Sequence, residues 1–491
     1  MEKYTNAFIH AFKTPNNFYF YDVNTNSIIS VYESIYRYLN KELDYDELCK
    51  NDKNTLKCIF DRGYLKENGI EKIHHPYTEI IPDVLERKVQ GIILQVTQNC
   101  NLRCKYCVYS GGYSSRGHSS KMMNYEIAKK GIDFLANHSS DMQELSVGFY
   151  GGEPLICFPL IKKVVEYSKK KLEEKKVLFH ISTNATLFNE EILTFLQKNK
   201  FSVLISLDGP KEIHDQNRKF ATGGGTFDTI IGHISYIKNN YHELYSRILF
   251  NAVIDPSLDS VCSNNFFISC QELDGASVQS SLISSEYKKI NVTIPEKFII
   301  QDRKEYFKIF LNKSGRLSKE YISRLSEEKF SVLYTTMFET RSKSNTLGSI
   351  MHPSGPCMPG GRKLFMSVNG DFFPCEKVSE TSKITQIGSI EEGFDYGKVE
   401  KLLNVGKITI NECKNCWAIR LCSLCAVAAD DTHSTELSRE KKLKVCDDVR
   451  NSSEEMLKNY CTFKEYGYTF TGKERSSYEY GRQEIWKKLI L

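Results

Sequence analysis

Apolar and polar positions alternate in blocks along the middle of the chain. Six short apolar runs are separated by longer stretches whose apolar positions recur at three- and four-residue spacing. The first pattern is typical of buried strands and the second of amphipathic helices. Strands are therefore predicted at residues 92–96, 145–150, 177–182, 203–207, 248–254 and 278–282. Alternating strands and helices predict an α/β protein with a parallel sheet, and six units fit a partial (β/α)6 TIM-like barrel.

The pattern changes on both sides of this barrel, and we predict five units. Residues 1–88 show two apolar runs around a turn-rich segment and then three short helical patterns, as expected for a winged-helix-like domain. Residues 89–310 form the barrel, and 311–350 form a polar helical bridge. Residues 351–465 are rich in Gly, Pro and Cys, which suits a domain held together by metal. Residues 466–491 are a charged, aromatic tail that could end in a helix at 485–491.

Composition favours a protein of the cytoplasm. No apolar run approaches the ~20 residues of a membrane span, and the N-terminus lacks the features of a secretory signal. The net charge of +5 is small, so neither a nucleic acid nor a membrane is an expected partner. The chain has 16 cysteines, and clustered cysteines in an intracellular chain of this length favour metal binding over disulfides.

Cys100, Cys104 and Cys107 form a tight triplet directly after the first predicted strand. A cubane iron–sulfur cluster normally takes four thiolates, so three close cysteines without a fourth predict a cluster with one open iron. An open iron can bind a substrate or a cofactor. The triplet lies on the face of the barrel where active sites gather. The alternative interpretation of these three residues is a zinc site.

Further polar residues follow the next strands. The segment 151–154 reads Gly-Gly-Glu-Pro, in which the glycines let the backbone approach a ligand and Glu153 offers a negative partner for an ammonium group. Because the carboxyl ends of parallel strands meet at one mouth, this segment and the later polar residues are predicted to converge. Those later residues are Ser182 and Asn184 after the third strand, and Ser206, Asp208, His214 and Arg218 after the fourth.

Together these motifs resemble those of the radical S-adenosylmethionine enzymes. The resemblance implies a [4Fe–4S] cluster on the triplet, whose open iron binds the amino and carboxylate groups of S-adenosylmethionine. It also implies a 5′-deoxyadenosyl radical that removes hydrogen from a substrate. By position, it places Tyr106 near adenine, Gly152 and Glu153 near the amino group, Ser182 and Asn184 near the ribose, Arg218 near the carboxylate, and Gly151, Ser206 and Asp208 in the same cofactor site.

The cysteines after residue 350 resemble the SPASM domain, which binds two auxiliary [4Fe–4S] clusters and would bring the total to three. Two residues rather than the usual three precede Cys425, and Met351 stands where some relatives have a further cysteine. The proximal cluster could therefore keep an open iron that binds a substrate thiolate, with Cys461 as a spare candidate ligand. The alternative is a two-zinc domain. The resemblance assigns Cys413, Cys416, Cys422 and Cys446 to a distal cluster, and Cys357, Cys375 and Cys425 to a proximal one.

These features favour a peptide-modifying enzyme. Our leading hypothesis is a maturase that forms thioether crosslinks, of the sactipeptide or ranthipeptide type, in a ribosomal precursor peptide. Its leader would bind the N-terminal domain by strand addition, and a flavodoxin- or ferredoxin-type protein would donate electrons. The N-terminal domain could instead be a structural cap. Glu376 is the candidate catalytic residue, for peptide contact or proton transfer.

Three other functions stay open. The first is a sulfatase-maturating enzyme that makes formylglycine, whose relatives place an Asp where this chain has Glu376. The second is carbon–carbon crosslinking or epimerisation of a peptide. The third is a non-enzymatic iron–sulfur scaffold or redox sensor, which would not cleave S-adenosylmethionine under strong reductant.

Overall fold

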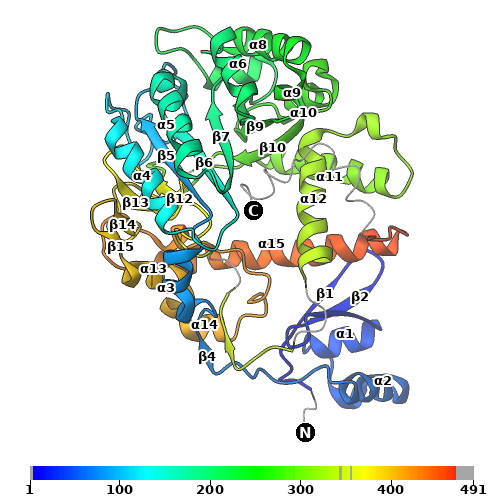
Figure 1. Ribbon diagram of the computed structural model, residues 1–491. Helices are drawn as coiled ribbons and strands as arrows, with labels where there is room; N and C mark the ends of the chain where they lie inside the picture. The colour runs from blue at the N-terminus through cyan, green and yellow to red at the C-terminus, as the bar shows by residue number, and fades with distance from the viewer. Residues whose placement is uncertain (1–3, 291, 342–345, 354–356, 472–491) are drawn as a thin grey trace.

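A ten-stranded sheet forms the centre of the protein (Figure 1). The computed structural model describes residues 4–290, 292–341, 346–353 and 357–471. Six neighbouring strands of the sheet run parallel and follow one another along the chain, which confirms the predicted α/β fold. They are β5 (Gly91–Thr97), β6 (Glu144–Gly151), β7 (Lys176–Thr183), β8 (Ser202–Ser206), β9 (Ile248–Ile254) and β10 (Ser277–Leu282).

Helices cover the outer face of this parallel part, as Figure 1 shows for α4, α5 and α6. Successive side chains of a strand point to opposite faces. Val147, Ile181 and Ile205 therefore pack outward into the largest hydrophobic cluster, while Tyr150 and His180 lie on the inner face. The connecting helices are α4 (Tyr125–Asn137), η3 (Pro154–Cys157), α5 (Phe158–Lys171), α6 (Glu190–Lys198), α7 (Lys211–Asn217), α8 (Phe227–Asn240), α9 (His242–Tyr245), α10 (Ser260–Ser269) and η4 (Gln271–Leu273).

The cysteine-rich region joins the same sheet. Strand β12 (Leu364–Met366) lies parallel to β5, and three antiparallel strands continue the sheet beyond it. This shared sheet was not predicted from the sequence, because a three-residue strand gives no periodic signal. The other elements of the region are β13 (Asp371–Phe373), β14 (Gly388–Ser389), β15 (Gly393–Phe394), α13 (Tyr396–Leu403), η7 (Val405–Thr409), α14 (Ile410–Lys414), η8 (Ala426–Ala429) and α15 (Arg439–Glu465).

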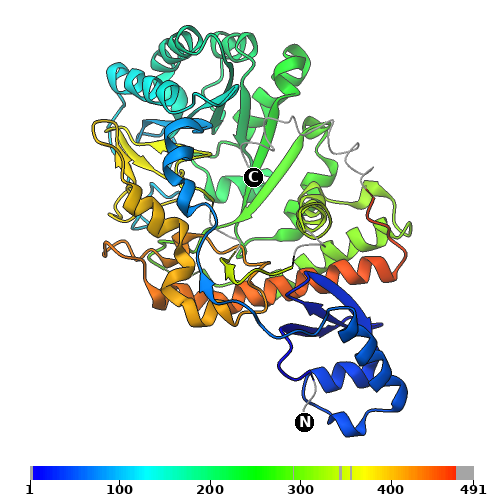
Figure 2. The ribbon, with the colours of Figure 1, turned by 60° about the horizontal axis from the view of Figure 1, so that its bottom comes forward.

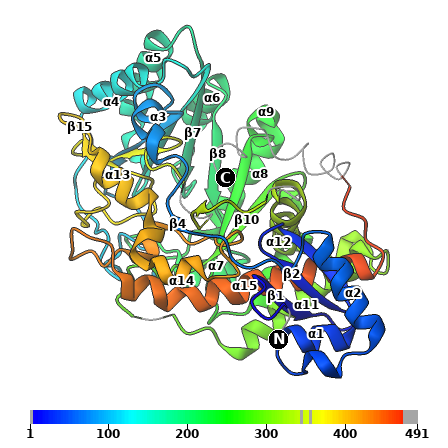
Figure 3. The same ribbon diagram turned by 90° about the horizontal axis from the view of Figure 1, so that it is seen from below.

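The N-terminal residues form a small sheet with helices on one side. Its strand order is β1–β2–β3, all antiparallel, so the predicted hairpin has a third strand that the sequence analysis missed. It packs beside α15, as Figures 2 and 3 both show. The elements up to the barrel are β1 (Ile9–Lys13), β2 (Phe18–Asp22), β3 (Ser27–Val31), α1 (Glu33–Leu39), η1 (Tyr45–Glu47), α2 (Lys50–Asp61), β4 (Lys72–Ile73), η2 (Thr78–Ile80) and α3 (Ile81–Arg87).

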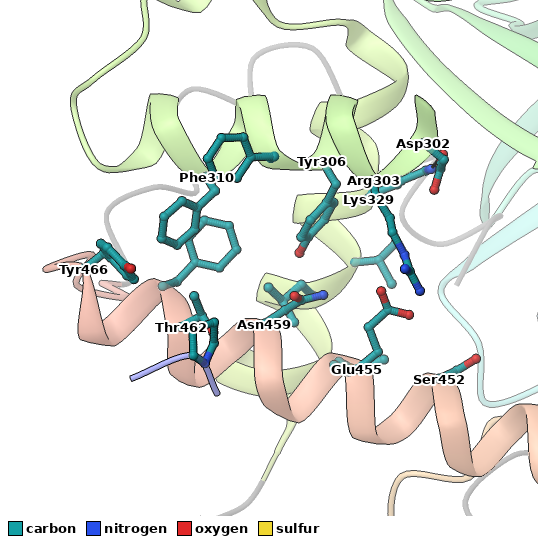
Figure 4. Close-up of a pocket in the computed structure, with 16 residues that line it drawn as sticks. Asp302, Arg303, Tyr306, Phe310, Lys329, Ser452, Glu455, Asn459, Thr462 and Tyr466 are labelled. Atoms are coloured by element: carbon teal, nitrogen blue, oxygen red, sulfur yellow. Dashed lines mark hydrogen bonds and ion pairs between the residues drawn. The ribbon is translucent and has the colours of Figure 1, made fainter. Parts of the chain in front are cut away.

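A helical segment connects β10 to the cysteine-rich region. It consists of α11 (Glu296–Lys313), η5 (Lys319–Tyr321), α12 (Arg324–Tyr334), the π-helical η6 (Thr335–Thr340) and β11 (Ile350–Met351). Together with α15, α11 and α12 enclose a groove of about 550 Å³ (Figure 4). No cysteine lines this groove, so it is distinct from the cysteine-containing candidate sites described below. None of the described helices combines the length and apolar character that crossing a membrane requires. The helix suggested at 485–491 lies outside the described residues.

Candidate functional site

The loop after β5 brings the first three cysteines together. Cys104 is buried, and Cys100 and Cys107 are half-buried. Burial raises the pKa of the Cys100 thiol to about 12 and that of Cys104 to about 11, and the neighbouring thiols of the triplet add to both shifts. The backbone N–H of Leu102 donates to Cys100 Sγ at 3.3 Å, and Asn184 Nδ2 donates to the same atom at 3.8 Å. Donors aimed at a buried sulfur fit a thiolate that ligates an iron–sulfur cluster.

The glycine pair packs against this cysteine loop. Gly151 has φ +144°, and a Cβ there would lie 2.1 Å from the carbonyl oxygen of Thr97. A Cβ on Gly152 would lie 2.1 Å from the carbonyl oxygen of Asn99. The backbone N–H groups of Gly152 and Glu153 donate to these two carbonyls, each at 2.9 Å. The close approach that requires glycine is therefore to the backbone of the cysteine loop.

Glu153 is hydrogen-bonded to three protein groups at the ends of neighbouring strands. Its carboxylate accepts hydrogen bonds from Leu155 N at 3.1 Å, from Thr183 Oγ1 at 2.7 Å and from Asn184 N at 2.8 Å. The side chain is 1% exposed, and burial raises its pKa to about 7 against the opposing effect of these donors. This carboxylate thus fastens the end of β6 to the end of β7, a structural task that the sequence analysis did not foresee.

Arg218 and Asp208 form a buried ion pair beside the triplet. Arg218 donates to both carboxylate oxygens of Asp208, at 2.9 and 3.2 Å. Tyr106 donates its hydroxyl to the same carboxylate, and its ring lies 5.3 Å from the guanidinium carbon of Arg218. The positive charge of Arg218 opposes the burial that raises the pKa of Cys104. Three residues assigned to the cofactor by resemblance are therefore connected to each other and to one cysteine.

The remaining assigned polar residues lie at the ends of neighbouring strands. Asn184 donates to Asn101 Oδ1 at 2.9 Å, which links the end of β7 to the cysteine loop. Ser182 and Ser206 are half-buried near the ends of β7 and β8. His214 is fully buried and contacts Thr226 Oγ1 at 3.0 Å, so it belongs to the packing around α7.

Four cysteines of the C-terminal region line a single small cavity. Burial raises the pKa of Cys422 to about 11, and the neighbouring thiols of Cys416 and Cys413 add to the shift. Cys446 lies on α15 near the same two thiols. The four residues are Cys413, Cys416, Cys422 and Cys446, the set assigned by resemblance to the distal cluster.

A second set of three cysteines lies near Glu376. Burial raises the pKa of Cys375 to about 12, and the Glu376 carboxylate and the thiols of Cys425 and Cys357 add to the shift. These three cysteines form the set assigned to the proximal cluster. In the part of the chain that the structure describes, no group of three or more His, Cys, Asp or Glu side chains is arranged to hold a single metal ion.

Met351 and Cys461 both pack in the second hydrophobic cluster. Met351 lies on β11, paired with Ile73 of β4. Cys461 is 4% exposed on α15, and burial raises the pKa of its thiol to about 12. It follows Cys446 by 15 residues of the same helix, or about 22 Å at 1.5 Å per residue. This distance separates Cys461 from the distal set, and its assignment as a spare ligand of the proximal cluster stays a prediction.

Two polar groups on or near the inner face of the barrel have no hydrogen-bond partner among the described residues. They are Glu376 Oε2 and His180 Nδ1, and both atoms are buried. Burial lowers the pKa of His180 to about 4, and the nearby charge of Lys363 lowers it further. Burial alone would raise the pKa of Glu376, but Lys363, Lys377 and Arg116 bring it below its ordinary value. Sequence reasoning missed His180, because one histidine in an apolar strand carries no distinguishing signal.

A buried ion pair connects the first cysteine loop to the C-terminal region. Arg116 Nε lies 2.7 Å from Glu380 Oε1, and Arg116 also donates to the carbonyl of Val378 at 3.0 Å. Gln95 of β5 donates to the same carboxylate at 2.6 Å. Neither charged residue was singled out in the sequence, since their spacing of 264 positions gives no local pattern.

Residues 94–253 match the model of the Radical SAM superfamily. This range contains the triplet, the glycine pair and the Asp208–Arg218 pair, so the chain carries a radical S-adenosylmethionine domain. The solved structure of native anSMEcpe with bound AdoMet has the same fold, with a TM-score of 0.55, 23% identity, and coverage of 77% of this chain and 97% of that one.

The chain is similar to several curated proteins. It is 26% identical to the cysteine-type anaerobic sulfatase-maturating enzyme of Clostridium perfringens, over 67% of this chain and 86% of that enzyme. It is 25% identical to the radical SAM cyclopropyl synthase TigE of Paramaledivibacter caminithermalis, over 60% of this chain and 65% of TigE. It is also 36% identical to an uncharacterized protein of Methanocaldococcus jannaschii, over 31% of this chain and 50% of that protein. The chain thus spans about half the length of that relative.

Proposed function

We propose that this protein is a radical S-adenosylmethionine maturase that forms thioether crosslinks in a ribosomally made precursor peptide. The supporting observation is the grouping of ten cysteines into sets of three, four and three. The last set has no fourth cysteine assigned to it and lies beside Glu376, one of whose carboxylate oxygens is buried and has no hydrogen-bond partner among the described residues. A site with both an incomplete set of thiols and a free acceptor is suited to a substrate thiol.

The residues around each set fit the groups that the family implies. Cys100, Cys104 and Cys107 would hold the first [4Fe–4S] cluster, and the other two sets would hold the auxiliary clusters. When bound, S-adenosylmethionine supplies the radical that removes a hydrogen atom from a substrate carbon. Arg218 and Asp208, which pair with each other at 2.9 Å, would form part of the wall of that site.

Crosslinking removes two hydrogen atoms from the peptide. The substrate loses one hydrogen atom from carbon and one proton from the cysteine thiol, and a C–S bond forms. One electron leaves the substrate, and an auxiliary iron–sulfur cluster held by Cys357, Cys375 and Cys425 would supply the acceptor. Glu376 would take the thiol proton, because its carboxylate lies beside Cys375 and, among the described residues, its buried Oε2 accepts no hydrogen bond.

The N-terminal sheet would bind the leader of the peptide. Its strand β3 lies at the edge of the sheet and pairs only with β2 among the described residues. The opposite edge strand, β1, contacts α15, and its His10 lies 3.1 Å from Glu454 of that helix. The His10 ring also stacks on that of Trp417, which follows α14, with 3.7 Å between ring centroids. An extended peptide can add to the uncovered edge through main-chain hydrogen bonds.

The decisive experiment incubates the anaerobically reconstituted enzyme with its candidate precursor. The proposal expects the loss of two hydrogen atoms per crosslink, a cysteine that no longer reacts with iodoacetamide, and release of 5′-deoxyadenosine. Substituting Glu376→Gln is expected to slow crosslinking while 5′-deoxyadenosine release continues. An unmodified peptide alongside that release would refute the proposal.

Leader docking has its own test. A photoreactive residue at Ser30, exposed on β3, is expected to crosslink the leader. The same residue at Lys13, exposed on β1, serves as the matched control at the opposite edge and is expected to give little product. Equal crosslinking at both edges would remove β3 as the docking site.

Formylglycine formation is the second candidate. It is supported by the similarity to the Clostridium perfringens enzyme over 67% of the chain and by a carboxylate, Glu376, directly after Cys375. Oxidation of a cysteine to formylglycine removes the sulfur and leaves an aldehyde. A product that reacts with a hydrazine and lacks the cysteine sulfur would establish this activity in place of crosslinking.

A further inference from the structure

Lys442 is a buried lysine beside one of the proposed distal ligands. Its side chain is 1% exposed and is among the largest fully buried side chains. Lysine is almost never buried unless it is paired, because its ammonium group is costly to remove from water. Lys442 Nζ donates to the hydroxyl of Thr409 and, at 3.2 Å, to Sγ of Cys413. Neither acceptor is a carboxylate, so the partner that balances this charge is not among the described side chains that it contacts.

The helix that carries Lys442 also carries a second cation and a thiol on the same face. Lys442, Cys446 and Arg450 follow one another at four-residue steps along α15, so their side chains lie one turn apart on one face. All three line the cavity that contains the four distal cysteines. Arg450 hydrogen-bonds Cys416 and also forms an ion pair with Asp447. The carboxylate of Glu412, which also lines the cavity, pairs with Arg439. In the described part of the chain, Arg450 thus has a carboxylate partner, whereas the hydrogen-bond partners of Lys442 are Thr409 and Cys413.

We propose that Lys442 tunes the reduction potential of the distal cluster, the group held by Cys413, Cys416, Cys422 and Cys446. This inference rests on the cluster assignment in the proposed function. A [4Fe–4S] centre with four thiolates is anionic, and its reduction adds one electron and one further negative charge. The potential of such a cluster depends on its net charge and on hydrogen bonds to its sulfurs. The ammonium group of Lys442 supplies both and favours the reduced state, which makes the cluster easier to reduce.

The test is a redox titration of the full-length, reconstituted chain followed by electron paramagnetic resonance. The signal of the distal cluster is identified by its loss in a Cys416→Ala variant. Lys442→Met removes the charge and the donor but keeps an unbranched side chain of similar length. Lys444→Met is the matched control, because Lys444 lies on the same helix and its side chain is 69% exposed.

Lys442→Met is expected to lower the ratio of reduced to oxidised distal cluster at least tenfold at a fixed potential, which corresponds to 59 mV for a one-electron couple. The proximal signal and the Lys444→Met variant are expected to stay at the wild-type potential. A distal potential that is unchanged in Lys442→Met, with iron content retained, would overturn the inference and leave the cluster assignment intact.

Two further outcomes are decisive. If Lys442→Met loses the distal cluster, Lys442→Arg is compared with it. If Lys442→Arg keeps the distal cluster near its wild-type potential, the role of the charge is supported. If both variants lose the distal cluster, that role is overturned. Iron counting of the wild type tests the cluster assignment independently of the role of Lys442. About twelve iron atoms per chain fit three cubanes, whereas a reproducible value near four would overturn both the assignment and the role of Lys442.

Discussion

Replacing Gly152 with alanine is expected to displace the first cysteine loop. The new Cβ would lie 2.1 Å from the carbonyl oxygen of Asn99 and 3.1 Å from Cβ of Cys100, whereas ordinary contact begins at 3.4 Å. The loop must therefore move by about 1.3 Å, the difference between 2.1 and 3.4 Å. The obstructing atom belongs to the backbone, so no side-chain rotation relieves the contact. Overpacking of this kind typically costs about 1–3 kcal/mol.

The movement carries Cys100 with it. Ligand distances in metal sites hold to within roughly 0.2 Å, so the displacement exceeds what the first cluster tolerates. We expect Gly152→Ala to lose about four iron atoms per chain, the content of one cubane. It should also lose reductive cleavage of S-adenosylmethionine. The three atoms nearest to the added Cβ belong to Asn99 and Cys100, so the cysteine sets after residue 350 are expected to keep their iron.

Gly112→Ala is the matched control for this experiment. Gly112 lies in the same loop, no heavy atom is within 4 Å of its added Cβ, and its φ is not in the left-handed region. Its iron content and cleavage rate should equal those of the wild type. Circular dichroism verifies that both variants are folded. A folded Gly152→Ala enzyme with full iron content and normal cleavage would refute the reasoning.

Three further predictions concern buried charges. Burial raises the folded-state pKa of Glu153 to about 7, so the stability contributed by this group is present below its ordinary pKa of 4.5 and is lost as pH rises toward 7. In the wild type, the free energy of unfolding measured by urea titration should fall by about 3 kcal/mol between pH 4.5 and 7 because of this group. Glu153→Gln should abolish that fall, and a variant with the same dependence of unfolding free energy on pH as the wild type would contradict this. Asp208→Asn leaves Arg218 unpaired and should cost about 3–5 kcal/mol, with partial recovery in the double variant with Arg218→Met; full stability of the single variant would argue against it. Glu380→Gln likewise removes the charge opposite Arg116, but the Glu380 side chain is 11% exposed against 1% for Asp208. A smaller loss is therefore expected in the same urea assay, and a loss larger than that of Asp208→Asn would contradict it.

Much of the barrel could be predicted because its signal is local. Each parallel strand is buried on its outer face, so it appears in the sequence as a compact apolar run, and β5 and β7 differ from their predicted ranges by one residue at each end. Strand β12 has three residues, and its place is fixed only by pairing with β5. Strand β1 is half-buried along most of its length and lacks a continuous apolar run.

The candidate sites also contain features that the sequence predicts and features that only the fold reveals. Cysteine spacing is local and chemically specific, so the three sets could be proposed from sequence and resemblance. The tasks of charged residues depend on partners that are distant in the sequence. Glu153 was interpreted as a ligand-facing carboxylate, yet its donors come from the end of the next strand. Lys442 lies in a lysine-rich segment that resembles a solvated helix face, and only the fold shows that it is buried.

The shared sheet gives the arrangement of the sites a mechanical consequence. The first cysteine loop follows β5, and Cys375 follows the β12–β13 hairpin that pairs beside β5. Main-chain hydrogen bonds and the buried Arg116–Glu380 pair therefore join the two regions directly. Opening a hinge at this position would separate paired strands and leave a buried arginine unpaired, at a cost of several kcal/mol. Under the proposed function, the first cysteine loop and Cys375 therefore keep a fixed position relative to each other when a peptide binds.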